Sequence, residues 1–382
     1  MMKQQIKSDF NFIPVFEPFI SLSDNLSVLK SLIKKNISGS SSPVKKFEDQ
    51  FSKFHSRNYG IGVTNGSVAL DLAFASLDLE EGDEVILPSH TIISCLASIV
   101  RNNGTPVFCD VNSDTWNMTL DDVKKVTTKN TKAVLMVHTF GLPADAINIS
   151  NFCNENNIYL IEDAAEAHGQ TFQNERCGSF GDISTFSFYA NKHVTTGEGG
   201  MVLTDSENLF KKISQMKNLD FTQKRFQHNN LYWNYRLGGL QASLGLSQLK
   251  KLDKIIEIKK KQGRIYFDLL KKHNNLFKLQ SSRVNDSENH YWVFGVLLKK
   301  ENIRDTVIDN LLKKGIETRP FFYPLHLQNA LPQKFRNKSV DLKISENLGN
   351  NGLYIPLGRH INFSKQKFIV ETLIETVKES YS

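Results

Sequence analysis

The chain has 382 residues, of which 40% are hydrophobic and 23% are charged. This length is too great for one small core, so two domains are the natural expectation. The hydrophobic fraction excludes a disordered chain, and 22 Gly with 10 Pro exclude a collagen-like or low-complexity sequence. The net charge of +7 is mild over this length, and it is compatible with nucleic acid, acidic small molecules or no particular partner.

The four cysteines lie far apart and form no CxxC pair; they are Cys95, Cys109, Cys153 and Cys177. They predict neither a zinc site nor a disulfide framework, and we expect them to be reduced and buried. Residues 1–16 lack the apolar segment of a signal peptide. No uncharged apolar run approaches the roughly 18 residues of a membrane span. The sequence therefore predicts a soluble, cytoplasmic protein without a metal site or a membrane partner.

Short apolar segments alternate with helical patterns over residues 51–204. Before them we expect a helix over Asn25–Lys35, with Leu26, Val28, Leu29, Leu32 and Ile33 on one face, and then a Gly-Ser loop over Ser38–Ser42. The expected strands are Glu84–Leu87, Val107–Asp110, Ala133–His138, Ile158–Glu162, Ser184–Phe188 and Met201–Thr204. Helices are expected between several of them, at Ser67–Leu77, Leu120–Lys125 and Ile147–Asn156. This alternation predicts an α/β fold with a mainly parallel sheet covered on both faces.

The pattern changes after Gly239. A long Lys-rich helix is expected from about Gln241 to Lys271, and its lysines fit a solvated face. Beyond it we expect a strand at His290–Leu298, a helix at Ile303–Lys313, a strand at Glu317–Tyr323 and a helix at Ser364–Lys378. These elements predict a smaller α+β domain. We place the large domain at residues 1–245 and the small C-terminal domain at residues 246–382.

Three polar segments lie where ligands bind in open parallel sheets, beyond the carboxyl ends of the strands. In the first, Gly66 and Ser67 open a helix after Thr64 and Asn65. Free backbone N–H groups and the positive end of the helix dipole suit a phosphate at such a position. Asn, Gly and Ser are also ordinary capping residues, so plain capping is the alternative.

The second segment is the strand Ile158–Glu162, which runs into Asp163 and is followed by Glu166. A carboxylate at the mouth of a buried strand is costly unless it has a partner. A protonated pyridine nitrogen is one good partner, and the N-terminus of the following segment is the other.

The third segment carries Lys192, between an apolar strand and a loop rich in threonine and glycine. Most lysines are solvated surface charges, but these flanks allow the amine to be partly desolvated. Desolvation lowers a lysine pKa and makes the amine a nucleophile for carbonyl chemistry. A phosphate cradle, an acid and an activated lysine are together what pyridoxal phosphate needs, since its aldehyde takes a lysine and its pyridinium a carboxylate.

Seven motifs of the chain resemble those of the DegT/StrS-type sugar-nucleotide aminotransferases. They are IPVFEP (13–18), TNGSVALDLA (64–73), GDEVILPSHT (82–91), IEDAAEAHG (161–169), TFSFYANKHVTTGEGGMV (185–202), NYRLGGLQASLG (234–245) and ETRPFFYPLH (317–326). They extend over nearly the whole chain. The resemblance implies the aspartate-aminotransferase fold, pyridoxal 5'-phosphate as the cofactor, and a homodimer.

The resemblance also implies roles for individual residues. Lys192 would be the Schiff-base lysine, Asp163 the acid on the pyridine nitrogen, and Glu166 a neighbour of the ring hydroxyl. The implied phosphate contacts are Gly66, Ser67 and Ser187, together with Asn234, which the partner subunit would lend. On this expectation the active site exists only in the dimer.

Two positions need comment. Where family members commonly stack an aromatic residue on the cofactor ring, this chain has Ile92, with His90 nearby. A dehydratase branch of the family has histidine in place of the Schiff-base lysine, and His193 directly follows Lys192. Lys192 lies five residues after Ser187 and five before Gly197, which matches the aminotransferase pattern. We therefore expect His193 to be only a neighbour.

The resemblance implies glutamate as amino donor and a nucleotide-linked 4-keto-6-deoxyhexose as acceptor. Residues 317–326 look most like perosamine synthases, which use GDP-4-keto-6-deoxymannose and would serve lipopolysaccharide O-antigen biosynthesis. Arg319, Tyr323 and His326 are candidate substrate contacts, although packing or an ion pair explains them equally well. The alternatives are a pyridoxal-phosphate-dependent sugar 3-dehydratase and a non-catalytic regulator of the same fold. No helix-turn-helix extension or basic tail indicates nucleic acid as a partner.

Overall fold

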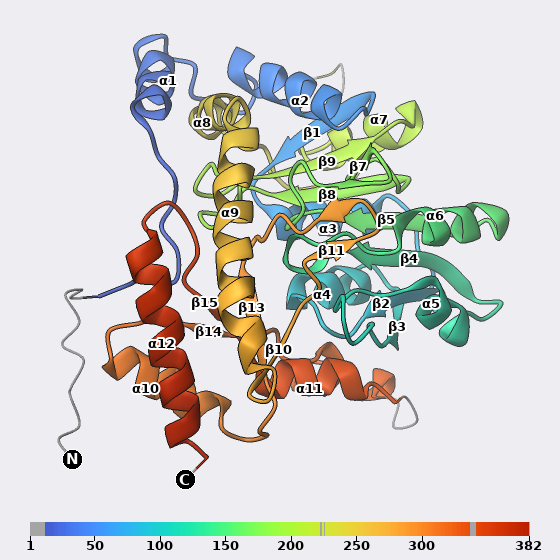
Figure 1. The fold of residues 1–382 in the computed structure, drawn as a ribbon. Coiled ribbons are helices and arrows are strands. Elements are labelled where there is room, and N and C mark those ends of the chain that lie inside the picture. Colours follow the sequence, from blue (N-terminus) through green and yellow to red (C-terminus); the bar gives the residue numbers. More distant parts are fainter. Residues whose placement is uncertain (1–11, 222–223, 225, 337–340, 382) are drawn as a thin grey trace, which may run out of the picture.

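A computed structural model describes residues 12–221, 224, 226–336 and 341–381. Its two main sheets come from different parts of the chain, seven strands from residues 59–204 and four from residues 277–355. Helices surround both sheets, and a long helix runs between them (Figure 1). This arrangement follows the two-part α/β organisation that the sequence predicts.

The larger sheet has the strand order β1-β9-β8-β5-β4-β2-β3. Its strands are β1 (Tyr59–Val63), β2 (Glu84–Pro88), β3 (Thr105–Cys109), β4 (Thr131–Val137), β5 (Tyr159–Asp163), β8 (Ile183–Ser187) and β9 (Gly200–Thr204). Only β9 runs antiparallel to its neighbours. The predicted mainly parallel sheet is confirmed, and six of the strands overlap predicted ranges.

The sequence pattern missed strand β1, because Gly60 and Gly62 weaken its strand pattern. The structure shows what these glycines allow. A Cβ on Gly60 would come within 2.6 Å of the Glu48 carbonyl oxygen, and one on Gly62 within 3.1 Å of the Leu237 side chain. Neighbouring segments therefore pack closely onto this edge strand.

Helices cover both faces of the larger sheet (Figure 1). They are α2 (Ser42–Phe54), α3 (Gly66–Ala75), α4 (Ile93–Arg101), α5 (Leu120–Val126), α6 (Ala146–Glu155) and α7 (Glu207–Met216). Successive residues of a strand point to opposite faces. Val85 and Leu87 accordingly join the core under α3 and α4, whereas Ile86 and Met136 join the core under α5 and α6. Two short ribbons, β6–β7 (Thr171–Phe172, Glu175–Arg176) and β11–β12 (Arg283–Val284, Ser287–Glu288), lie outside the main sheets.

The single long helix predicted over Gln241–Lys271 is wrong. The structure has two helices instead, α8 (Gly239–Leu249) and α9 (Leu252–Leu270). At the break, Lys251 leaves helical geometry with φ −113° and ψ 2°, and its amine lies 2.5 Å from the carboxylate of Asp24. This contact joins residues far apart in the sequence, which explains why no local breaker marks the junction.

Helix α1 (Leu22–Ile33) forms where the sequence predicts a helix, but its polar side packs inward against α8. Asp24 is fully buried, and Ser31 Oγ lies 2.5 Å from Ser243 Oγ. The apolar side chains are instead exposed: Leu22 by 74%, Leu26 by 55%, Leu29 by 50%, Leu32 by 49% and Ile33 by 73%. An exposed apolar face of this kind indicates an interaction surface.

The smaller sheet has the order β10-β13-β15-β14 and is antiparallel throughout. Its strands are β10 (Phe277–Leu279), β13 (Phe294–Leu298), β14 (Arg319–Pro320) and β15 (Gly352–Ile355), and its helices are α10 (Arg304–Lys313), α11 (Lys343–Asn351) and α12 (Phe363–Glu379). The α+β character predicted here is confirmed. The strand predicted over Glu317–Tyr323 is shorter in the structure, where β14 spans only Arg319–Pro320.

The segment before α1 packs with the smaller sheet rather than with the larger one. Ile13 is fully buried in the core around α9 and α12, and its backbone bonds with Gly315 and Glu317. The Val15 N–H donates to a carboxylate oxygen of Glu317 at 3.0 Å. The proposed division of the chain at residues 245 and 246 stays a prediction, and it falls within α8.

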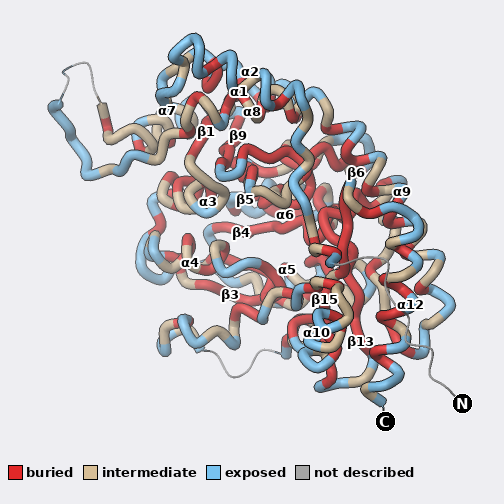
Figure 2. Tube along the Cα trace, turned by 90° about the vertical axis from the view of Figure 1, so that its left-hand side faces the viewer, coloured by how far each residue is buried: buried red, intermediate tan, exposed pale blue. Residues whose placement is uncertain are grey.

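Buried residues run through both sheets, and the exposed residues lie on the outer helices and on the connecting segments (Figure 2). The chain that follows α7 stands away from the body of the molecule in the same view. None of the helices in the described ranges is both long enough and apolar enough to cross a membrane.

Candidate functional site

A cavity of about 560 Å³ lies at the carboxyl ends of β5 and β8, beside the first turn of α3. Residues of both sheet regions line it, since the part after α9 contributes Trp292, Phe322 and Tyr354. Seven residues singled out from the sequence line this cavity: Gly66, Ser67, Asp163, Glu166, Ser187, Lys192 and Arg319. The strand ends thus bring together side chains from four separate motifs.

One end of the cavity is a helix N-terminus built for close approach. Asn65 caps α3, and its side chain accepts the Val68 N–H at 2.9 Å. The N–H groups of Gly66 and Ser67, in the first turn, have no intrahelical partner. A Cβ on Gly66 would lie 2.7 Å from the Ser187 Cβ. Ser67 Oγ lies 2.6 Å from Ser94 Oγ. Backbone N–H groups and hydroxyls therefore converge on one point, which suits a phosphate.

At the other end, Asp163 ends β5 with its carboxylate in the cavity. It accepts the Ala165 N–H at 3.1 Å, and the Cys95 thiol lies 3.5 Å from its second oxygen. Burial raises the pKa of Asp163, while the Ala165 bond and the charge of Lys192 act in the opposite direction. Such a carboxylate is stabilised by any cation that enters the cavity.

The neighbouring acid, Glu162, points to the other side of the sheet. It accepts bonds from His138 Nε2 at 2.8 Å and from the N–H groups of Gly178 and Phe180 at 2.5 and 2.9 Å. Burial favours a higher pKa for Glu162, but these bonds hold it below its usual value. His138, Glu162 and Cys177 lie close enough to hold a metal ion. The hydrogen bonds already made by the carboxylate give it a structural role instead.

Lys192 lies in the loop after β8, with its amine inside the cavity. Its Nζ is 3.8 Å from Glu166 Oε1 and 3.7 Å from the centre of the Trp292 ring. Burial lowers the pKa of this amine, against the opposing charges of Glu166 and Asp163. Burial likewise raises the pKa of Glu166 to about 7. The two shifts therefore bring the proton affinities of the amine and the carboxylate closer together.

Ile92, His90 and His193 have different surroundings in the structure. Ile92 lines the cavity and is 40% exposed, so it can cover a flat ligand with an aliphatic surface. His90 is fully buried, with its ring against those of Phe140, Phe321 and Phe322. His193 does not line the cavity, and its Nε2 lies 3.2 Å from the His290 carbonyl oxygen.

The structure separates the remaining candidates. Arg319 lines the cavity and pairs with Glu317 at 2.8 Å. Tyr323 is 49% exposed outside it, and His326 is held between Ser89 Oγ at 2.7 Å and Glu346 at 3.2 Å. Asn234 is exposed on the segment after α7 and does not line the cavity of its own chain.

Four aromatic side chains of the cavity were missed from the sequence: Tyr189, Trp292, Phe322 and Tyr354. Tyr189 and Phe322 lie inside motifs but carried no chemical signal of their own. Trp292 and Tyr354 lie outside the motifs and reach the cavity only through the packing of the smaller sheet. Trp292 is the one in direct contact with Lys192.

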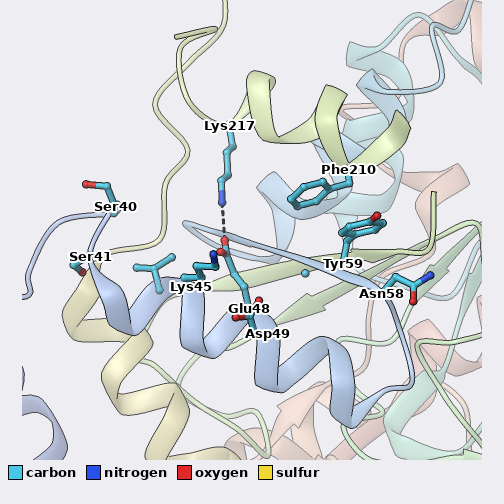
Figure 3. A pocket seen from close by; sticks show the side chains of 12 residues that line it. Ser40, Ser41, Lys45, Glu48, Asp49, Asn58, Tyr59, Phe210 and Lys217 are labelled. Atoms are coloured by element: carbon cyan, nitrogen blue, oxygen red, sulfur yellow. Dashed lines mark hydrogen bonds and ion pairs between the residues drawn. The ribbon is translucent and has the colours of Figure 1, made fainter. Parts of the chain in front are cut away.

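A second cavity, of about 280 Å³, lies over β1 between α2 and α7 (Figure 3). Its Lys217 and Glu48 bind each other at 2.6 Å, and the ring of Tyr59 stacks on that of Phe210 with 4.5 Å between centroids. None of the residues singled out from the sequence lines it. The chemistry therefore belongs to the first cavity.

The two acids at the end of β5 allow a direct test of these assignments. We predict that Glu162→Gln lowers the free energy of unfolding by about 2–4 kcal/mol, because its amide would face backbone donors. Asp163→Asn keeps an acceptor for the Ala165 N–H, and we expect it to change stability by less than about 1 kcal/mol. Urea unfolding of both variants measures the contrast. Equal losses would contradict the opposite placement of the two side chains.

The chain is similar to known proteins over nearly its whole length. The model of the DegT/DnrJ/EryC1/StrS aminotransferase family matches residues 22–374. A GDP-perosamine synthase of Escherichia coli O157:H7 is 34% identical over 365 residues, which cover 95% of this chain and 98% of the relative.

Two solved structures have the same fold. An aminotransferase from Psychrobacter cryohalolentis has a TM-score of 0.88 at 27% identity, covering 97% of this chain and 100% of its own. The E. coli GDP-4-keto-6-deoxy-D-mannose-3-dehydratase with bound hydrated PLP has a TM-score of 0.85 at 26% identity, covering 94% and 99%. The predicted fold and the predicted enzyme class are confirmed: this chain belongs to the DegT/DnrJ/EryC1/StrS aminotransferase family.

Proposed function

We propose that this enzyme transfers an amino group from glutamate to the 4-keto group of GDP-4-keto-6-deoxymannose, forming GDP-perosamine. The observation that carries the proposal is the single cavity in which Lys192, Asp163 and the first turn of α3 meet. The similarity to a GDP-perosamine synthase over nearly the whole of both chains supports the choice of sugar.

The cofactor is pyridoxal phosphate, as predicted from the sequence, and a related structure contains it. The residues of the cavity fit this group. The N–H groups of Gly66 and Ser67, with Ser187, suit its phosphate; Asp163 suits its pyridine nitrogen, and Lys192 its aldehyde. Glu166 is left for the ring hydroxyl. When bound, the cofactor supplies a ring that accepts electrons from the carbon being deprotonated.

The side chains of the cavity would then have different roles in the reaction. Lys192 holds the cofactor covalently and, once its amine is free, carries the proton to and from the reacting carbon. Burial lowers the pKa of that amine, so a larger fraction of it is neutral and able to accept a proton. Asp163 keeps a negative charge opposite the pyridine nitrogen. Arg319, the cavity's other cation among the described lining residues, suits a carboxylate of glutamate or the diphosphate.

The identity of the residue in the cavity favours transamination over 3-dehydration. Lys192 points into the cavity, whereas His193 turns away toward His290. The family resemblance associates the dehydratase branch with histidine at the position of the Schiff-base lysine. A one-residue shift would be needed to place His193 there.

We also propose a homodimer in which Asn234 of the partner subunit reaches the phosphate. Three observations support it. Asn234 is exposed and outside the cavity of its own chain. The same projecting segment exposes Leu231 fully and Trp233 by 68%. The outward apolar face of α1 (Leu22–Ile33) has no partner among the described residues. A second copy would cover these apolar surfaces and complete both sites.

A cytoplasmic location and a place in lipopolysaccharide O-antigen biosynthesis remain predictions. The four cysteines are all free and buried, which fits a reducing compartment. The sugar of the proposed product, perosamine, would be incorporated into this polysaccharide.

Product analysis tests the proposed reaction. With glutamate and GDP-4-keto-6-deoxymannose, we predict a 4-amino sugar nucleotide by mass spectrometry, and none from Lys192→Ala. Lys261→Ala, on the exposed side of α9, is the control and should retain activity. Preference for a dTDP-linked ketosugar would correct the substrate, a 3-deoxy product would favour the dehydratase, and no turnover with tight DNA binding would favour the regulator.

Mixing two inactive variants tests the shared site. Lys192→Ala and Asn234→Ala each impair both sites of their own dimer. If subunits exchange at random, half of the dimers are mixed and each contains one intact site, so we predict recovery to about one quarter of full activity. Mixed dimers isolated through two different tags and lacking activity would contradict the contribution of Asn234.

A further inference from the structure

Trp292 contacts the amine of Lys192 more closely than any carboxylate does. Its ring centre lies 3.7 Å from Lys192 Nζ, against 3.8 Å for the nearest oxygen of Glu166. The indole is 6% exposed, so water does not compete for this contact. An ammonium group over the face of a desolvated indole is attracted by the electrons of the ring.

Three hydrogen bonds from three parts of the chain hold Trp292 in this position. Its backbone N–H donates to the carbonyl of Phe140 at 3.0 Å. Its indole N–H donates to the carbonyl of Asn191, the residue before Lys192, at 3.2 Å. Its own carbonyl accepts the amine of Lys259, a buried residue of α9, at 2.9 Å. The ring is therefore fixed relative to Lys192 and not merely packed near it.

The backbone around Trp292 adopts costly conformations. Tyr291 has a φ of +50° and Phe140 a φ of +61°, a region that bulky residues rarely adopt. The Phe140 N–H donates to the Glu166 carboxylate, and the Phe140 carbonyl accepts the Trp292 N–H. This one strained residue is therefore hydrogen-bonded to both residues that contact the amine of Lys192. Gly263 of α9 makes room for this bend, since a Cβ there would lie 2.3 Å from the Tyr291 ring.

We propose that Trp292 is a positioning residue that seats the protonated amine of Lys192 on its indole face whenever that amine is free. This inference rests on the proposed role of Lys192, and it adds a residue from outside the motifs that carry the family resemblance. The amine stays on this indole face, beside Glu166, after it releases the cofactor and before it transfers the proton. Because the indole stabilises the charged form, it opposes the effect of burial on the amine.

Other charged and titratable groups also act on this amine. Those whose charges are coupled to it are Glu166, Asp163, Cys95, His168 and Lys259. Substitution of Trp292 by an uncharged residue leaves all of them in place. Any change in the proton affinity of Lys192 can then be assigned to the lost ring.

The test measures the pKa of Lys192 in the full-length protein without cofactor. Limited labelling with an amine-reactive reagent is followed across neutral to alkaline pH, and peptide mass spectrometry quantifies the label on Lys192. We predict that Trp292→Leu lowers this pKa by roughly 0.5–1.5 units, as a contact of this type is worth. Trp292→Phe keeps an aromatic face and should lose less than half of that shift. Phe322→Leu removes a ring from the same cavity wall, but this ring is not the one over the amine. The pKa of Lys192 should therefore be unchanged in this variant.

An unchanged pKa in both Trp292 variants would overturn the proposal, as would an equal shift in Phe322→Leu. If Trp292→Leu does not fold, the comparison of Trp292→Phe with Phe322→Leu decides, because only the first should lower the pKa. The measurement needs neither cofactor nor sugar. If the proposed transamination fails, the pKa measurement can therefore still be interpreted. If the pKa of Lys192 does not change, the result of the product assay is unaffected.

Discussion

Burying a lysine amine next to two carboxylates is the constraint on which this cavity depends. An ammonium group loses its hydration when it leaves water, and only nearby negative charge or an aromatic face compensates for that loss. Glu166, Asp163 and Trp292 surround Lys192 in this way. Each also shifts the balance between the charged and neutral amine, so the arrangement that stabilises the lysine sets its reactivity as well.

The fold places these groups by bringing distant segments to one edge of the larger sheet. Asp163 and Lys192 follow adjacent strands, β5 and β8, and α3 begins beside them. Trp292 lies just before β13 of the smaller sheet, so the two sheet regions must meet for the cavity to close. Packing of the polar side of α1 inward leaves its apolar side outward, which fits a molecule whose site is completed by a second copy.

Local pattern sufficed to predict most of the polar residues that line the cavity, because they belong to short motifs at strand ends. Gly66, Asp163 and Lys192 all lie where the alternation of strands and helices places them. The break before α9 depends on a contact between Lys251 and Asp24, which are far apart in the sequence. The inward turn of the polar side of α1 and the place of Trp292 over the lysine likewise depend on tertiary contacts, which no periodicity encodes.

The central claim is that Lys192 is the lysine that holds the cofactor. Borohydride reduction of the holoenzyme followed by peptide mapping tests it most directly. The chain offers its own comparison, since burial lowers the pKa of Lys259 to about 7 and this amine also lies behind the cavity wall. We expect the reduced cofactor on Lys192 alone. Cofactor found on Lys259, or retained covalently by Lys192→Ala, would contradict it.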